Sequence, residues 1–419
     1  MLKRSIRKYE MVLLMINGVI GAGIFGLPSK AFRETGSWSL VAFLVCAIAV
    51  YFIILCFAEV SSRFDKTGGP YVYALEAFGP LPAFVTGWLL LLSRFLTYAA
   101  LINLLVTYLT VFNHWFGTDQ GRVITITGLT LMFGLINHVG IRNTTSVNNF
   151  LAVGKMTALI IFILAGLFFI NPDYFPASPP PSFTTFSATV LVLMFSFGGF
   201  ESVLVNSGEV QNPGKTLPFA LLVAPLIIAT TYLLIQFVCI ETLPDLATSE
   251  KPLAEAAEKF MGRGGAIFIA IGALLSIAGT LNAIMLVGSR LPYAFSQEGQ
   301  FPGVFSFVHP RYHTPTWSLL LFLVVTIIVS LYNTFIDAAT ISAITRVMIY
   351  AIVCIALIRL RRRSTTEAVF RVRYGNVVAV IGFILTIWLL SGSPLNKMRD
   401  VIISVAVGIV IYFFVRRKK

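Results

Sequence analysis

The sequence predicts an all-α polytopic membrane protein, and two observations carry this prediction: the composition and the length of the apolar runs. Of 419 residues, 57% are hydrophobic and only 12% are charged, and the mean hydropathy is +0.87. A soluble domain averages roughly 25% charged residues, so this chain has too few to cover a water-facing surface. Most of its apolar runs are long enough to cross the bilayer hydrocarbon, which takes about 20 helical residues.

Twelve apolar runs are expected to be transmembrane helices. They cover residues 11–32, 38–61, 82–112, 122–139, 149–171, 183–207, 217–243, 263–290, 316–333, 335–358, 375–391 and 399–415. The longest polar connection is only about 25 residues, and no small-residue cleavage site follows the first run. We therefore expect one transmembrane domain over residues 1–419, with neither a soluble domain nor a cleavable signal peptide.

The basic residues predict how the chain crosses the membrane. The formal net charge is +13, and the densest basic cluster is RLRRRSTTEAVFRVR at 359–373. With both termini in the cytoplasm, 20 of the 31 Lys and Arg residues lie on the cytoplasmic side and 8 on the external side. This positive-inside bias predicts cytoplasmic termini and an inner or plasma membrane. Contact with anionic lipid headgroups explains the charge without a nucleic-acid partner.

The cysteines and histidines, four of each, show no metal-ligand spacing and no arrangement typical of nucleophilic catalysis. The sequence therefore predicts no metal, no cofactor and no enzymatic activity.

A glycine-rich stretch lies in the first span. Residues 18–28 read GVIGAGIFGLP and contain the G-x-G-x-x-G pattern of dinucleotide-binding turns. Pro28 follows too soon for the helix that such a turn needs, so this reading is rejected. Glycine weakens a helix by about 1 kcal/mol relative to alanine, which predicts unwound backbone lining a cavity at membrane depth. Close helix packing through small residues is the alternative.

A second glycine pair supports the cavity. Residues 195–202 read FSFGGFES and interrupt the sixth span. Interruptions at matching positions of two halves are typical of transporters built from inverted repeats. We therefore expect repeats at about 11–171 and 183–358, a substrate site between them, and two peripheral helices at about 375–415.

Further motifs follow in a recognisable order over nearly the whole chain. They are IGAGIF at 20–25, GGPYVYALEAFG at 68–79, FSFGGFES with GEVQNPGKTLPFA at 208–220, PLAEAAEKFMG at 252–262 and SRLPYAFSQEGQFPGVFSFVHPRYHTP at 289–315. Jointly they resemble amino acid permeases of the amino acid–polyamine–organocation (APC) superfamily. The resemblance implies a leucine-transporter-like fold, with ten core helices in two inverted five-helix repeats, and alternating access around the two broken helices.

The resemblance also implies a substrate site made of backbone groups. The substrate carboxylate would bind N–H groups around Gly21, Ala22 and Gly23. The α-amino group would bind carbonyls near Val19, Ile20, Phe195 and Gly198. Phe195 matches an aromatic gate in relatives, and Glu201 matches a conserved acid in some of them. Gly198 and Gly199 leave room beside the sixth helix. Since Glu201 is the only acid near the breaks, neutral substrates are favoured.

Charged residues within the spans are functional candidates because they are costly in a bilayer. Some family members carry a lysine at the place of Lys155 instead of a bound sodium ion. The match implies a proton carrier or a fixed cation, with Thr280 as its hydroxyl partner. Snorkelling to the cytoplasmic interface is the alternative for Lys155.

Two arginines also lie within spans. Arg94 keeps its charge and needs a partner; Glu201 or a substrate carboxylate would serve, and a structural ion pair is favoured. Arg346 is expected to serve gating or packing. Glu59 and Arg63, at the end of the second span, are expected to pack at the cytoplasmic side.

The functional hypothesis is a secondary-active amino acid transporter, proton-coupled and for neutral substrates. Alternatives within the class are an amino acid exchanger or exporter and a polyamine or other amine permease. From another class, a non-transporting amino acid sensor on the same scaffold stays possible.

Overall fold

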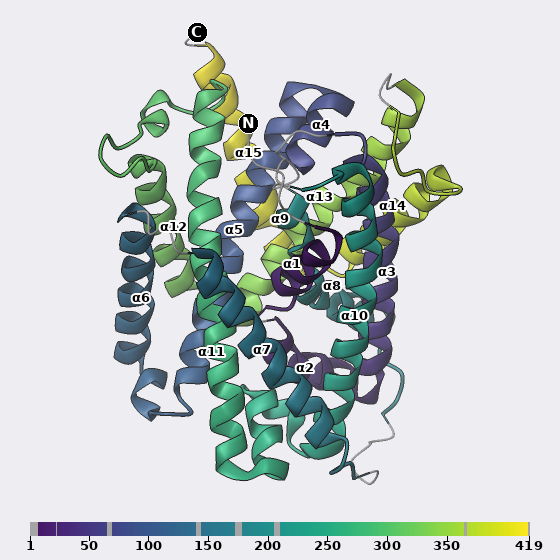
Figure 1. Cartoon of the computed structure of the whole chain (residues 1–419), viewed down its shortest axis with the longest axis vertical. Helices are drawn as coiled ribbons and strands as arrows, with labels where there is room; N and C mark the ends of the chain where they lie inside the picture. The colour runs from purple at the N-terminus through teal and green to yellow at the C-terminus, as the bar shows by residue number, and fades with distance from the viewer. Residues whose placement is uncertain are drawn as a thin grey trace.

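The computed structural model describes residues 7–21, 23–64, 69–139, 144–171, 178–204, 210–363 and 367–417, and these residues form helices and no β-strand (Figure 1). In chain order the α-helices are α1 Lys8–Val19, α2 Gly23–Thr35, α3 Ser39–Ser61, α4 Pro70–Phe78, α5 Pro80–Leu109, α6 Asp119–Val139, α7 Thr144–Gly166, α8 Phe183–Phe197, α9 Phe200–Leu204, α10 Pro213–Thr242, α11 Pro252–Gln297, α12 Thr316–Tyr332, α13 Phe335–Arg363, α14 Gly375–Ser391 and α15 Leu395–Arg417. Short 3-10 turns at 36–38, 114–117, 246–248 and 303–306 join some of them.

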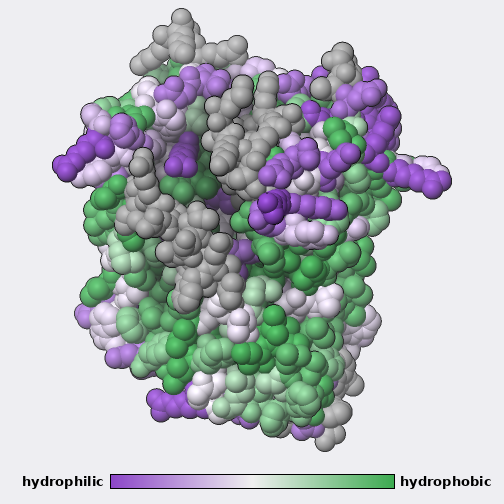
Figure 2. Space-filling model, viewed as in Figure 1, coloured by the Kyte–Doolittle hydropathy of each residue, from purple (hydrophilic) through white to green (hydrophobic). Residues whose placement is uncertain are grey.

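The helices are suited to a membrane. Among the described residues, seven helical segments are long and apolar enough to cross one, and four shorter apolar helices accompany them. Large apolar side chains are exposed on the outer helices, including Leu135 on α6, Ile384 on α14 and Val410 on α15. Figure 2 shows hydrophobic residues over the middle and lower flank, with hydrophilic residues gathered near the upper end. The chain is an integral membrane protein; the twelve-span count and the inverted repeats stay predictions.

The first predicted span is broken where its glycines lie. Helix α1 ends at Val19 and α2 begins at Gly23, with Gly21 in the bend between them. A Cβ on Gly23 would lie 2.7 Å from Cα of Ser196 on α8. The glycines therefore serve both purposes that the sequence suggested: the helix is interrupted, and the start of α2 packs directly on the backbone of α8.

The sixth predicted span is broken in the same way. Helix α8 ends at Phe197 and α9 begins at Phe200. Gly199 has a φ of +119°, a region that side chains rarely allow. A Cβ there would lie 2.5 Å from the carbonyl oxygen of Gly18. The two interruptions are therefore in direct backbone contact.

Tyr232 on α10 links the two interruptions. Its hydroxyl lies 2.9 Å from the carbonyl oxygen of Ser196 and 3.3 Å from that of Val19, so it can donate to a carbonyl of either broken helix. Tyr232 is fully buried, where an unsatisfied hydroxyl would be costly. This tyrosine fixes the ends of α1 and α8 relative to each other.

The remaining helices surround this centre. Helices α5 and α13 pack against each other and form one wall, and α11 contributes another. Helices α6 and α12 pack together on one flank, and α3 and α14 on the opposite flank (Figure 1). Helix α11 contains a non-helical residue, Gly262, with a φ of +66°. The predicted span at 263–290 therefore begins directly after a kink.

Candidate functional site

A cavity of about 190 Å³ lies where the two interruptions meet. This is below the roughly 300–1,000 Å³ typical of pockets for drug-sized ligands, so the cavity suits a small molecule. Residues expected from the sequence that line it are Val19, Gly21, Gly23, Arg94, Lys155, Phe195, Gly198, Gly199 and Thr280. Ile20 and Glu201 are buried behind this lining, and Ala22 lies outside the described residues.

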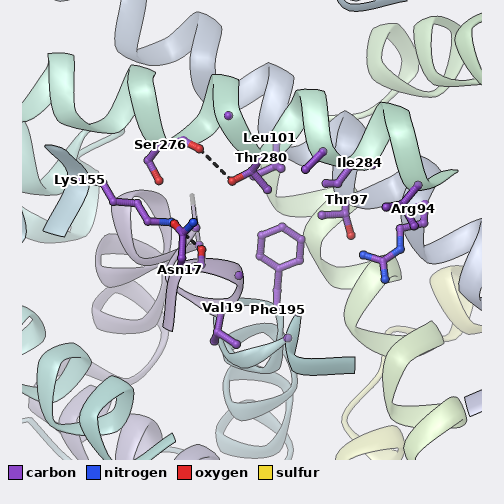
Figure 3. A pocket seen from close by; sticks show the side chains of 18 of the residues that line it. Asn17, Val19, Arg94, Thr97, Leu101, Lys155, Phe195, Ser276, Thr280 and Ile284 are labelled. Atoms are coloured by element: carbon purple, nitrogen blue, oxygen red, sulfur yellow. Dashed lines mark hydrogen bonds between the residues drawn. The ribbon is translucent and has the colours of Figure 1, made fainter. Parts of the chain in front are cut away.

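Lys155 occupies one end of the cavity. Its side chain is only 3% exposed, and its Nζ donates to the carbonyl oxygens of Asn17 and Ile20, both at 2.6 Å. These carbonyls belong to the C-terminal end of α1, where the helix dipole favours a cation. The side chain points inward to this end (Figure 3), and not along the lipid as a snorkelling lysine would. Lys155 therefore caps the first interruption from α7.

Thr280 lies on α11 in the cavity wall. Its hydroxyl donates to the carbonyl oxygen of Ser276 at 2.9 Å, one turn earlier on the same helix (Figure 3). The bonds described for the Lys155 ammonium go to α1 instead. The expected contact between Lys155 and the Thr280 hydroxyl is therefore not among the described hydrogen bonds.

Arg346 on α13 lines the cavity, which the sequence did not indicate. Its Nε donates to Oγ of Ser93 at 3.2 Å, and its Nη2 donates to Oγ1 of Thr97 at 3.0 Å. The guanidinium carbon lies 5.8 Å from the centroid of the Phe195 ring. The only available signal was the depth of Arg346 within its span, which it shares with Arg94.

Glu201 on α9 is the acid beside Arg346. One carboxylate oxygen lies 3.6 Å from Nη1 of Arg346. The other accepts the Gly199 N–H at 2.9 Å and the Tyr350 hydroxyl at 3.2 Å. The second interruption therefore carries its own carboxylate, which faces α13.

Arg94 on α5 lies on the same side of the cavity, beside Thr97 and opposite Lys155 (Figure 3). Its side chain is 7% exposed, and it interacts electrostatically with Glu201 and with Arg346. The partner expected for Arg94 is thus shared, because the carboxylate of Glu201 pairs with Arg346 and also attracts Arg94.

Phe195 contacts an aromatic residue that lines a second cavity. Its ring meets the ring of Phe335, the first residue of α13, edge to face with centroids 6.1 Å apart. Phe335 lines a neighbouring cavity of about 350 Å³ between the end of α2, α5 and the start of α13. One of the two touching rings therefore lines the central cavity, and the other lines the neighbouring, peripheral cavity.

A bundle of apolar helices, two of them interrupted beside a cavity that three cationic side chains line, is typical of a membrane transporter. The family model described as amino acid permease matches residues 10–415, and the chain belongs to this family, within the APC superfamily.

Three relatives illustrate the range of the family. The chain is 27% identical to the methylthioribose transporter of Bacillus subtilis (strain 168), over 100% of this chain and 94% of that protein. It is 26% identical to the branched-chain amino acid permease BcaP of the same organism, over 100% of this chain and 94% of the permease. It is 30% identical to the cystine/glutamate transporter of Homo sapiens, over 75% of this chain and 65% of that transporter.

Proposed function

We propose that the protein is a secondary-active amino acid transporter that works by alternating access around the central cavity. One observation carries the proposal: the ends of two broken helices meet at a buried cavity of small-molecule size, with a lysine on the carbonyl end of the first. Family membership and relatives whose names specify amino acids support the substrate class.

The amino acid headgroup would bind at the first interruption. The first N–H groups of α2, beginning at Gly23, have no partner within their own helix and suit a carboxylate, as does the N–H of Gly21. Carbonyl groups at the end of α1 and at Phe195 and Gly198 would receive the α-amino group. The Ile20 carbonyl already accepts from Lys155, and the Val19 carbonyl from Tyr232, so a substrate would use their second lone pairs.

Phe195 and Phe335 would form a gate. Their edge-to-face contact would close the path between the central and the peripheral cavity. Alternating access requires such a barrier on one side at a time, and rotation of either ring would open it. With cytoplasmic termini, as the basic residues predict, this gate lies on the external side.

Coupling would be through Lys155. Its ammonium joins α7 to α1, so loss of a proton would remove a cation that holds the interruption together. This supports proton coupling. An exchanger would use Lys155 as a fixed charge. The described lining contains no carboxylate, which disfavours polyamines and other cationic substrates.

Uptake into liposomes tests the proposal. Purified protein is reconstituted and offered labelled amino acids, with and without an inward proton gradient and with and without unlabelled amino acid inside. Stimulation by the gradient in empty vesicles supports proton symport, and Lys155→Ala should then abolish the pH response. Uptake only into preloaded vesicles makes the protein an exchanger. No movement of any amino acid under any condition contradicts transport and favours a sensor.

A further inference from the structure

The central cavity carries more positive charge than a neutral amino acid would balance. Three cationic side chains line it, those of Arg94, Lys155 and Arg346, and no carboxylate does so among the described residues. Glu201, behind the lining, supplies the one negative charge that pairs with this group. With Lys155 protonated, three positive charges less one negative leave an excess of two, and without that proton the excess is one. The site is buried, where charge is poorly screened.

The cationic side chains fall at two places. At one end, the ammonium of Lys155 is already hydrogen-bonded to two backbone carbonyls at the end of α1. Arg94 on α5 lies across the cavity from Lys155, with the Phe195 ring between them (Figure 3). Arg346 on α13 also lines the cavity, and its guanidinium carbon lies 5.8 Å from the centroid of the Phe195 ring. A substrate whose headgroup lies at the first interruption would direct its side chain toward the arginines.

Arg346 is held in position but retains a donor. Two of its nitrogens donate to the hydroxyls of Ser93 and Thr97. Its third, Nη1, makes no hydrogen bond among the described residues and is buried, so a ligand in the cavity would reach it only after the guanidinium shifts. The 3.6 Å that separate Nη1 from Glu201 exceed the roughly 2.7–2.9 Å of a charge-assisted hydrogen bond. A second carboxylate is the acceptor that best matches such a guanidinium.

The second interruption is shaped around this guanidinium. A Cβ on Gly198 would overlap the Arg346 guanidinium nitrogen Nη1. Gly198 has a φ of −76° and a ψ of 159°, which any residue can adopt, so the backbone itself does not demand glycine. The missing side chain instead makes room for Arg346 to reach the cavity.

We infer that the cavity accepts amino acids with an anionic side chain, and that Arg346 and Arg94 are the residues that select them. The inference rests on the proposed transport function. An acidic amino acid has two carboxylates and one ammonium group. Its α-carboxylate meets the N–H groups at the first interruption, its side-chain carboxylate meets the arginines, and its net negative charge offsets part of the excess. This replaces the neutral substrates that the scarcity of acids near the breaks had favoured.

Near-isosteric ligands test the inference. Glutamate and glutamine, like aspartate and asparagine, match in shape and differ by one charge. A bound ligand raises the melting temperature of the full-length protein in detergent by mass action, and a titration gives its affinity. We expect each acidic member to bind at least roughly tenfold more tightly than its amide. The same preference should appear in liposome uptake.

Three variants assign the preference to residues. Arg94→Gln and Arg346→Gln should each bring the two members of a pair to within about threefold of each other. Arg94→Lys keeps the charge and should retain part of the preference. Arg399→Gln removes an exposed arginine paired with Asp400 and serves as the matched control, which should leave the preference unchanged.

The outcomes separate the two proposals. Equal or tighter binding of the amides by the wild-type protein overturns the inference, and transport of those amides would leave the proposed function intact. An undiminished preference in folded Arg94→Gln and Arg346→Gln variants also overturns it. If these variants do not fold, the wild-type comparison decides alone. Failure to bind or move any amino acid overturns the proposed function, and the inference with it.

Discussion

Among the described residues, two buried carboxylates are paired with arginine, and they differ in how completely their hydrogen-bonding capacity is satisfied. Glu59, at the end of α3, accepts four hydrogen bonds. Arg361 donates from Nε at 2.7 Å and from Nη2 at 2.5 Å, the Val372 N–H donates at 2.9 Å, and Arg63 donates at 3.2 Å. These bonds fasten the end of α3 to the end of α13 and to the segment before α14.

Glu201 is the looser case. It accepts an N–H from its own turn and a hydroxyl from Tyr350, and its arginine lies 3.6 Å away. The Glu59 pair is remote from the central cavity, whereas the arginine of the Glu201 pair lines it. Buried charge is therefore satisfied to different degrees here. The Glu59 carboxylate, with four hydrogen bonds, fixes helices, whereas in the Glu201–Arg346 pair beside the cavity one arginine nitrogen makes no hydrogen bond among the described residues.

Removing the negative charge of Glu59, whose carboxylate accepts four hydrogen bonds, should have the largest effect on stability. In Glu59→Gln the charge of a fully buried carboxylate is lost, and the half-buried Arg361 loses its counter-ion. Breaking such a pair costs on the order of 3–5 kcal/mol. Thermal denaturation in detergent and size-exclusion chromatography measure it. Glu34→Gln, which breaks a partly exposed pair with Lys30, is the matched control and should cost at most about 1 kcal/mol. Equal stability of the two variants would contradict a structural role for Glu59.

In the Glu201–Arg346 pair, Arg346→Gln should cost about 3 kcal/mol of stability, because it leaves the buried Glu201 carboxylate beside a neutral side chain. The double variant Arg346→Gln/Glu201→Gln removes both charges and should regain about half of that loss. The preference for glutamate over glutamine should be absent in both. Melting curves without ligand, with glutamate and with glutamine measure both quantities. A double variant less stable than the single one would show that the pair is not what holds these residues.

Filling the space beside Arg346 should have a smaller effect. In Gly198→Ala the new methyl group displaces the guanidinium, at a cost of about 2 kcal/mol for overpacking. We expect glutamate affinity to fall by roughly tenfold, as measured by ligand-induced shifts in melting temperature. Gly128→Ala on α6 is the control, since a Cβ there meets nothing within 4 Å. Unchanged glutamate affinity in Gly198→Ala would mean that Arg346 does not contact the ligand.

The smallest change is Tyr350→Phe. It removes one hydrogen bond to Glu201 and keeps the ring contacts with Phe57 and Phe200. The expected loss is about 1 kcal/mol of unfolding free energy, from the missing hydroxyl donor. A chemical-denaturation midpoint measures it, with Tyr332→Phe, at an 86% exposed side chain, as the comparison. A loss as large as that of Glu59→Gln would mean that the Glu201–Arg346 pair is more tightly coupled than its distances indicate.

The sequence predicted the features that depend on local chemistry. Glycine runs marked both helix interruptions, because glycine weakens a helix wherever it lies. The depth of Lys155 within an apolar run marked it as a functional candidate, because charge is costly in the bilayer.

The sequence did not predict the pairings that depend on helix rotation. Glu201 and Arg346 are far apart in the chain, as are Glu59 and Arg361, and each meeting is set by how α3, α9 and α13 turn toward one another. These helices are apolar on nearly every side, so periodicity does not reveal the inward face. The same reason hid Arg122 at the start of α6, whose guanidinium donates to the carbonyls of Ser330 and Asn333.

The hydroxyl of Tyr232 has a mechanical consequence. Because this hydroxyl lies within hydrogen-bonding distance of carbonyls at the ends of both α1 and α8, we expect the two interruptions to move together if transport rearranges the helices. Arg94 and Arg346 belong to α5 and α13, which pack against each other on the far wall. A substrate long enough to contact both the interruptions and the arginines would connect the two sides of the cavity. A shorter substrate would contact only the interruptions. Side-chain length, in addition to charge, would then determine whether binding is transmitted into movement.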